Sequence, residues 1–186
     1  MMATTHAFAG LTVVSPLAYL APEFAAPLAL GAFAGGLAPD FDLPLAHRRT
    51  FHFPIVGLVG VVLAVAFAFY APTAATLTIA AFVAAAWLHA ASDVFGGGPE
   101  MDPWRNRTER AVYDHVRGRW LRPKRWIRYD GAPEDAVLAF VLALPALVVF
   151  DGWVRTVVLG GLGVSVAYAL LRRRLIRWTA DWEWLE

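Results

Sequence analysis

Residues 54–91 read "PIVGLVGVVLAVAFAFYAPTAATLTIAAFVAAAWLHAA", and this stretch decides the fold class. Pro54 to Ala71 is a run of 18 residues without a charge, and Thr73 to Ala91 is a run of 19 whose only ionisable side chain is His89. A hydrocarbon core of ~30 Å needs about 20 helical residues to cross it. Each run therefore predicts one membrane-crossing helix.

A second pair of apolar runs lies toward the C-terminus. Asp135 to Phe150 and Val154 to Leu171 are separated only by "DGW", residues 151–153, which predicts a tight turn. Pro145 lies inside the first of these runs and predicts a kink that neighbouring helices must accommodate.

The N-terminal pair is shorter. Ala7 to Ala21 is followed by Ala25 to Ala38, and the latter run gives only ~21 Å of helix. Gly31 and Gly35 lie four residues apart, a spacing that lets a neighbouring helix approach closely, although the chain is rich in alanine and glycine throughout. We therefore predict an all-α, polytopic helical membrane protein of three helical hairpins, about six apolar helices in all, with the first two short or re-entrant.

The composition agrees with a membrane protein of one domain. The 186 residues are 59% hydrophobic, and the absence of cysteine excludes disulfides, thiolate metal sites and cysteine nucleophiles. The start of the chain does not resemble a cleavable signal peptide, so Met1 onward is interpreted as mature sequence. Four parts are expected within the single integral membrane domain: a motif-bearing core 1–98, a basic and aromatic loop 99–134, a transmembrane hairpin 135–171 and a tail 172–186.

The basic residues predict the orientation in the membrane. If three hairpins cross the bilayer, Arg155 lies on one side and the other 15 of the 16 Lys and Arg residues lie on the opposite side. The positive-inside rule makes the arginine-rich side cytoplasmic. We therefore expect a multi-pass protein of the cell (plasma) membrane with both termini in the cytoplasm.

The long loop combines arginine with aromatic residues. Val112, Val116 and Trp120 repeat every four residues, which predicts an amphipathic surface helix within 108–131. Basic and aromatic residues beside membrane spans are typical of contact with lipid, so we expect anionic headgroups at residues 105–128. Nucleic acid is the less favoured partner for a loop of this composition. The C-terminal tail is interpreted as a charge stop followed by an interfacial anchor.

Histidines and carboxylates gather at the cytoplasmic ends of the apolar runs. The stretch "PDFDLPLAHRRTFHF", residues 39–53, is one group, "HAASD", residues 89–93, is a second, and the start of the first helix adds a third. Three hairpins would bring these groups to one membrane depth. The candidate metal ligands are His6, Asp40, Asp42, His47, His52, His89 and Asp93.

Imidazole and carboxylate donors suit Zn²⁺ first, with Mn²⁺ or Fe²⁺ as alternatives, and seven candidates allow one or two ions. Each group alone has a simpler interpretation. The His89 and Asp93 pair could be a hydrogen-bonded helix end, Asp40 a helix cap, and His47 part of a basic loop that sets topology. Ionisable groups at a membrane edge tend to mark function, and their coincidence at one depth favours a shared metal site.

The motifs "TTHAFAG", "GGLAPDFDLP", "HRRTFHF" and "WLHAASDVFGGG" occur in this order over residues 1–98. In order and spacing they resemble the YdjM-like family of inner-membrane-associated proteins described as metal-dependent hydrolases. The resemblance implies the same seven ligand candidates. The chain departs from the family pattern at Phe51 and Phe53, where the family tends to have Thr and Ser, and at Gly96, where Thr is common.

Outside this resemblance, Glu100, Asp102, Asp114 and His115 are further candidates; Asp114 is expected to pair with Arg110 or Arg117, and His115 is the best additional ligand or proton carrier.

A membrane-bound, metal-dependent hydrolase of phosphoester or lipid-linked substrates is the leading hypothesis. The ion would lower the pKa of coordinated water to ~7. Asp42 or Asp93 would act as general base, while Arg48 and Arg49 would hold an anionic phosphate. The alternative is a non-catalytic scaffold with a structural metal site and a partner-binding loop. A transporter would place ionisable groups at the midplane of several spans, and the interiors of the apolar runs carry no charged residue or histidine.

Overall fold

The computed structural model describes residues 1–104 and 107–180, and over this part of the chain it is built almost wholly from helices. Its α-helices are α1 (Ala3–Leu20), α2 (Ala25–Leu37), α3 (Gly57–Tyr70), α4 (Ala74–Ser92), α5 (Pro133–Val149) and α6 (Gly152–Ala180). Short 3₁₀ turns extend three of the chain's connections: η1 (Pro22–Phe24), η2 (Ala38–Asp42) and η3 (Asp93–Phe95).

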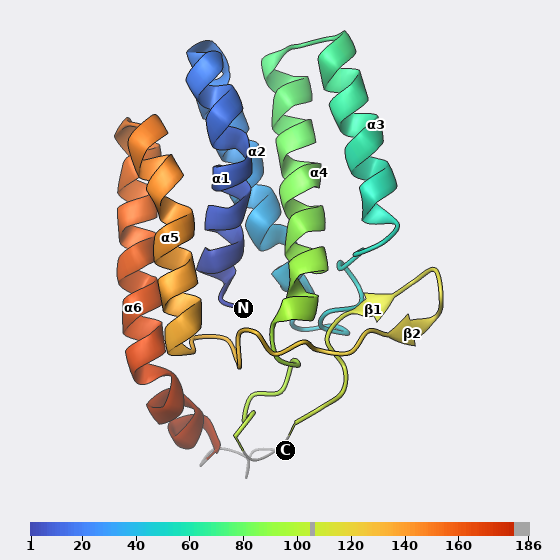
Figure 1. Ribbon diagram of the computed structural model, residues 1–186, viewed down its shortest axis with the longest axis vertical. Coiled ribbons are helices and arrows are strands. Elements are labelled where there is room, and N and C mark those ends of the chain that lie inside the picture. Colours follow the sequence, from blue (N-terminus) through green and yellow to red (C-terminus); the bar gives the residue numbers. More distant parts are fainter. Residues whose placement is uncertain (105–106, 181–186) are drawn as a thin grey trace.

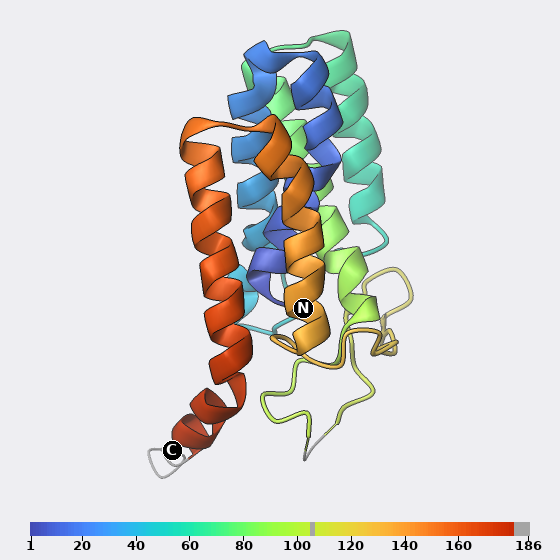
Figure 2. The ribbon, with the colours of Figure 1, turned by 60° about the vertical axis from the view of Figure 1, so that its left-hand side comes forward.

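The helices stand side by side with their long axes roughly aligned (Figure 1). The short connections that join α1 to α2, α3 to α4 and α5 to α6 lie at one end, and the longer loops gather at the other (Figures 1 and 2). The N-terminus and the C-terminal end of α4 both lie at the end with the long loops. The ligand candidates are at this end of the molecule as well, because they come from the first turns of α1, the last turn of α4 with η3, and the segment from η2 to the start of α3.

The predicted all-α membrane architecture is confirmed at the coarse level. Within the described residues, three helical stretches are long and apolar enough to cross a membrane: Pro22–Asp42, Ala74–Phe95 and Gly152–Arg177. The apolar helix α3 is shorter, at 14 residues, and α5 has 17. The second predicted span reaches this length because the 3₁₀ turns η1 and η2 extend α2 at its two ends. Six full membrane crossings stay a prediction.

Helix α1 forms the centre of the core. Phe8 and Leu11 are completely buried, and the helix contacts α2, α4, α5 and α6. Because α1 packs on so many sides, its N-terminal turns are held rigidly against the rest of the bundle.

The close approach predicted at the paired glycines is confirmed, and α4 is the neighbour. A Cβ added to Gly31 would collide with the backbone oxygen of Thr78, and one added to Gly35 would collide with that of Phe82. Only glycine lets the two backbones approach this far. This contact fixes α2 against α4 and so places the end of α2 beside His89.

The amphipathic helix predicted within the long loop is wrong. No helix lies between Phe95 and Pro133 in the described part of the loop, which instead contains two short antiparallel strands, β1 (Tyr113–Asp114) and β2 (Arg119–Trp120). In the four-residue stripe that suggested a helix, Val112 directly precedes β1, Val116 lies in the turn and Trp120 lies on β2.

Local turn chemistry overrides the helical stripe. Gly118 has a φ of 63°, in the left-handed region that a helix interior does not use. The Asp114 carboxylate accepts hydrogen bonds from the backbone N–H groups of Val116 and Arg117 at 2.9 and 3.1 Å, and it pairs with the Arg117 guanidinium as expected. These bonds hold the chain in a turn. Residues 105–106 of the predicted lipid-binding loop and 181–186 of the predicted anchor lie outside the described residues.

Candidate metal centre

Five of the seven ligand candidates converge at the loop end of the bundle. His6 comes from the first turns of α1, His89 from the last turn of α4, and Asp93 begins η3. Asp40 lies in η2, and His52 lies in the loop before α3. Residues separated by more than 80 positions in the sequence therefore form one cluster, and four of the five are buried, with Asp40 partly exposed.

Asp93 is the centre of this cluster. Its Oδ1 lies 3.2 Å from Nε2 of His6, and its Oδ2 lies 3.3 Å from Nε2 of His52 and 3.7 Å from Nε2 of His89. Asp40 approaches from the other side, with its Oδ1 3.3 Å from Nε2 of His89. The rings of His6 and His89 stack with their centroids 3.7 Å apart. Two overlapping donor groups result, one of His6, His89 and Asp93 and one of Asp40, His52 and His89.

The facing atoms make no hydrogen bonds. Nε2 of His6, His52 and His89 and both oxygens of Asp93 are buried without a hydrogen-bond partner among the described residues. Leaving a buried polar group unpaired costs about 1–3 kcal/mol. Five such atoms in one cluster indicate a ligand for them to hold, because native proteins satisfy nearly all of their buried polar atoms.

The other nitrogens of His89 and His52 fix their protonation. Nδ1 of His89 lies 2.7 Å from the backbone oxygen of Gly36, and Nδ1 of His52 lies 3.0 Å from Oδ2 of Asp42. Both partners are acceptors, so each Nδ1 carries the proton and donates it. In the neutral imidazole, each Nε2 then presents a lone pair to the centre of the cluster.

Ser92 fixes the position of the proton on His6 in a similar way. The Ser92 hydroxyl donates its one hydrogen to the backbone oxygen of His89 at 3.0 Å, so toward Nδ1 of His6, at 3.2 Å, it acts as an acceptor. Nδ1 of His6 is therefore the donor, and its Nε2 is a third inward lone pair. Lone pairs that face carboxylate oxygens repel one another unless a proton or a metal cation lies between them. The donor set fits a divalent metal.

Asp42 holds ligands in place instead of facing the centre. Its Oδ1 accepts a hydrogen bond from Nδ1 of His47 at 2.8 Å, and its Oδ2 accepts bonds from Nδ1 of His52 and from the backbone N–H of Phe51 at 3.2 Å. Both oxygens are thus occupied, and the residue is fully buried. The sequence placed Asp42 among the ligands and bases; the structure places it behind them, as the carboxylate that orients a metal-binding histidine.

His47 also lies outside both donor groups. Its ring is pinned through Nδ1 to Asp42, and its side chain is 22% exposed, which leaves the second ring nitrogen accessible. Because this nitrogen is neither buried nor among the convergent atoms, His47 is better placed for proton transfer than for ligation.

The two neighbouring arginines differ in their surroundings. Arg48 is buried, donates to the backbone oxygen of Gly97 at 2.7 Å, and has its Nε 3.6 Å from Oδ2 of Asp93. Arg49 is exposed and lies over the ring of Tyr113, 4.4 Å from its centre. The amino group of Met1, 3.6 Å from Oδ1, adds a further positive charge beside Asp93. Arg48 thus belongs to the centre, whereas Arg49 lies on the surface.

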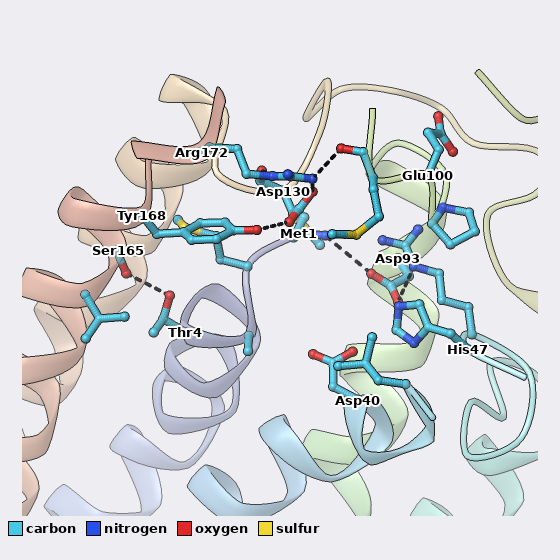
Figure 3. A pocket seen from close by; sticks show the side chains of 18 residues that line it. Met1, Thr4, Asp40, His47, Asp93, Glu100, Asp130, Ser165, Tyr168 and Arg172 are labelled. Atoms are coloured by element: carbon cyan, nitrogen blue, oxygen red, sulfur yellow. Dashed lines mark hydrogen bonds and ion pairs between the residues drawn. The ribbon is translucent and has the colours of Figure 1, made fainter. Parts of the chain in front are cut away.

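A cavity of about 390 Å³ opens beside the cluster, between α1 and α6 (Figure 3). We call it the α1–α6 cavity. One wall carries Asp40, His47 and Asp93, and the opposite wall carries Ser165, Tyr168 and Arg172 of α6. Arg172 is buried and paired with Asp130 at 2.9 Å, and the Tyr168 hydroxyl donates to Asp130 at 2.5 Å. Of the five convergent ligand candidates, Asp40 and Asp93 therefore border this cavity.

Several contributors were not foreseen from the sequence. Ser92 could have been found, because it lies three residues after His89 on the same helix. Gly36 acts through a backbone oxygen, which no side-chain pattern reveals. His115, expected as an additional ligand, instead packs against Phe53 and Tyr113 on the surface.

Comparison of the chain with protein-family models, with curated proteins and with solved structures finds no significant match.

Proposed function

We propose that this protein is a membrane-bound, metal-dependent hydrolase of phosphoesters at the cytoplasmic face, and a member of the YdjM-like family. The observation that supports it best is the set of buried, unpaired Nε2 atoms of His6, His52 and His89 around the unpaired carboxylate of Asp93. These residues, with Asp40, would hold the ion. Zinc is the first choice for such a donor set, and manganese or iron are the alternatives.

The bound ion would supply Lewis acidity toward water and a phosphoryl oxygen. The chain itself offers a proton carrier in His47, whose Nδ1 is held by Asp42 while the rest of the ring borders the α1–α6 cavity. In this proposal His47 takes a proton from the attacking water, which adds to phosphorus as the ester P–O bond breaks. It then returns the proton to the departing alkoxide, and the products are an alcohol and a phosphate.

Asp40 and Asp93 remain as the carboxylates that face the reacting group. In this proposal neither carboxylate expected as the general base takes that role, because both oxygens of Asp42 are engaged elsewhere and Asp93 is among the residues that would hold the ion. Arg48, close to Asp93 and on the cavity wall, would bind an anionic phosphate oxygen. Arg49 would guide anionic substrates from the surface.

The membrane arrangement is part of the proposal. With six helices crossing as three hairpins, the loop end of the bundle faces the cytoplasm, as the distribution of arginine predicts. Trp126, 71% exposed, and the arginines of residues 105–128 would contact anionic headgroups near the site.

A structural metal site in a non-catalytic scaffold is the second candidate. Structural sites are saturated by protein ligands and closed to solvent, whereas catalytic sites keep an accessible position. The cavity that reaches Asp40 and Asp93 favours the catalytic alternative.

Metal analysis of the detergent-purified protein tests the proposal. We expect stoichiometric divalent metal in the parent and in His115→Ala, a surface histidine that serves as control, and at least tenfold less in His89→Ala and Asp93→Asn. His47→Gln should keep its metal yet lower phosphoester turnover about 10²-fold or more. A parent without metal, or equal metal in all variants, contradicts the proposal. Full metal with no turnover of any phosphoester favours the scaffold.

A further inference from the structure

A second cavity reaches the candidate metal centre from another side. It has a volume of about 350 Å³ and is lined by residues of α1, α4 and α5 together with the loop tip at Trp126 and Ile127. We call it the α4–α5 cavity. Its floor is α1, which lies between α4 and α5 in Figure 1. The residues that tie it to the centre are His6 and Ser92, a candidate ligand and the partner of that ligand.

The α4–α5 cavity is apolar along its length. Ala9 forms its floor beyond His6, Leu88 forms one wall, and Leu138 and Leu142 form the other. On α5, Leu138 and Leu142 are four residues apart, so this wall follows the helix axis for about one turn, ~5 Å. A hydrocarbon chain that runs along the bilayer normal would lie parallel to this wall, with its polar end toward His6.

The two cavities differ in character and meet at one residue. The α1–α6 cavity carries the charged groups Glu100, Asp130 and Arg172, whereas the α4–α5 cavity carries no charged side chain apart from His6, if protonated. Met1 lines both. The candidate ligands Asp93 and His6 therefore lie between a charged cavity and an apolar one. The scissile bond of an amphiphile lies at the same kind of boundary, between its polar group and its chain.

We propose that the substrate is a membrane amphiphile, a phosphoester of a long-chain alcohol or acylglycerol. Its chain occupies the α4–α5 cavity and its phosphate group faces Asp93 and the α1–α6 cavity. The inference rests on the proposed function and specifies its substrate class. In this proposal the apolar cavity takes up the chain and lets the ester reach the centre without leaving the bilayer.

Binding of two non-hydrolysable phosphonates tests this assignment without relying on turnover. The full-length, zinc-loaded protein in phosphatidylcholine nanodiscs would be titrated with octylphosphonate and with methylphosphonate, and empty nanodiscs would be subtracted as a blank. We expect at least tenfold tighter binding of octylphosphonate. Ala9→Phe should fill the cavity and reduce the preference to within twofold, with methylphosphonate affinity and zinc content unchanged. Leu142→Trp narrows the cavity from the opposite wall and should reduce the chain-length preference in the same way.

Ala66→Phe is the matched control, because Ala66 is exposed on α3 and does not line the cavity. It should keep the chain-length preference. Equal affinity for the two phosphonates in the parent, or a full preference in Ala9→Phe, overturns the inference. If zinc and phosphoester turnover are intact in that case, only the substrate class is wrong. If the protein holds no zinc, or if neither phosphonate binds, the hydrolase proposal and this inference are both contradicted.

Discussion

At the scale of single residues, Asp42 has an organising role that its position in "PDFD" does not reveal. One carboxylate fixes the tautomer of two histidines: His52, whose Nε2 faces the centre, and His47, which borders the α1–α6 cavity. A change at Asp42 therefore acts on ligation and on proton transfer together. The size of its effect on metal affinity therefore shows whether Asp42 orients the histidines.

Asp42→Asn is expected to weaken metal affinity by about 10–100-fold, because the amide cannot accept hydrogen bonds on both sides and His52 loses its fixed tautomer. Competition with a chelator of known affinity measures the change. Asp114→Asn, which alters a carboxylate that only holds the β1–β2 turn, should leave the affinity unchanged. An Asp42→Asn protein with parental affinity would contradict the orienting role of Asp42.

At the scale of elements, the helices follow from the apolar runs, and their spacing follows from small residues. α2 approaches α4 so closely that Gly35 has no room for a side chain against Phe82. This contact positions the end of α2, and with it Gly36, whose backbone oxygen accepts a hydrogen bond from Nδ1 of His89. The packing of α2 against α4 and the orientation of the His89 ring are thus linked through the backbone of α2.

Gly35→Ala is expected to destabilise the bundle by about 1–3 kcal/mol through overpacking. The apparent Tm in detergent should fall by roughly 3–10 °C. Gly160→Ala on α6, where an added Cβ meets nothing within 4 Å, is the control and should leave the Tm unchanged or slightly raised. Scanning fluorimetry compares the three proteins, and equal Tm values would contradict the close packing described for α2 and α4.

At the scale of the whole molecule, the bundle has two unlike ends. Short connections lie at one end, whereas the long loops, the N-terminus and the candidate centre lie at the other (Figure 1). If this second end faces the cytoplasm, a membrane substrate reaches the centre at the inner leaflet. The orientation can be tested directly because the chain contains no cysteine.

Single cysteines at two exposed positions report the orientation. Asp151→Cys lies in the short α5–α6 connection, and Arg117→Cys lies in the β1–β2 turn; the native side chains are 84% and 59% exposed. In intact cells, an impermeant maleimide should label Asp151→Cys, and it should label Arg117→Cys only after permeabilisation. The opposite pattern would place the centre outside the cell, and labelling of both from outside would rule out a membrane crossing between them.

The sequence by itself determined the class of fold and the donor types. Uncharged runs long enough to cross a bilayer predict helices, because a backbone in lipid must satisfy its own hydrogen bonds. His6, His52, His89 and the nearby aspartates stood out because ionisable groups are rare beside such runs. The helix predicted in the loop was wrong, since turn bonds at Asp114 and the left-handed Gly118 outweigh a three-residue stripe.

Only the tertiary structure decided which donors face one another. Asp93 is central and Asp42 peripheral, although both are aspartates near histidines, because the packing of α1 against α4 brings His6 to Asp93. The roles of Ser92 and the Gly36 oxygen also depend on that packing. Hydrogen bonds and coordination act over about 3 Å, and sequence spacing cannot fix distances of that order between residues on different helices.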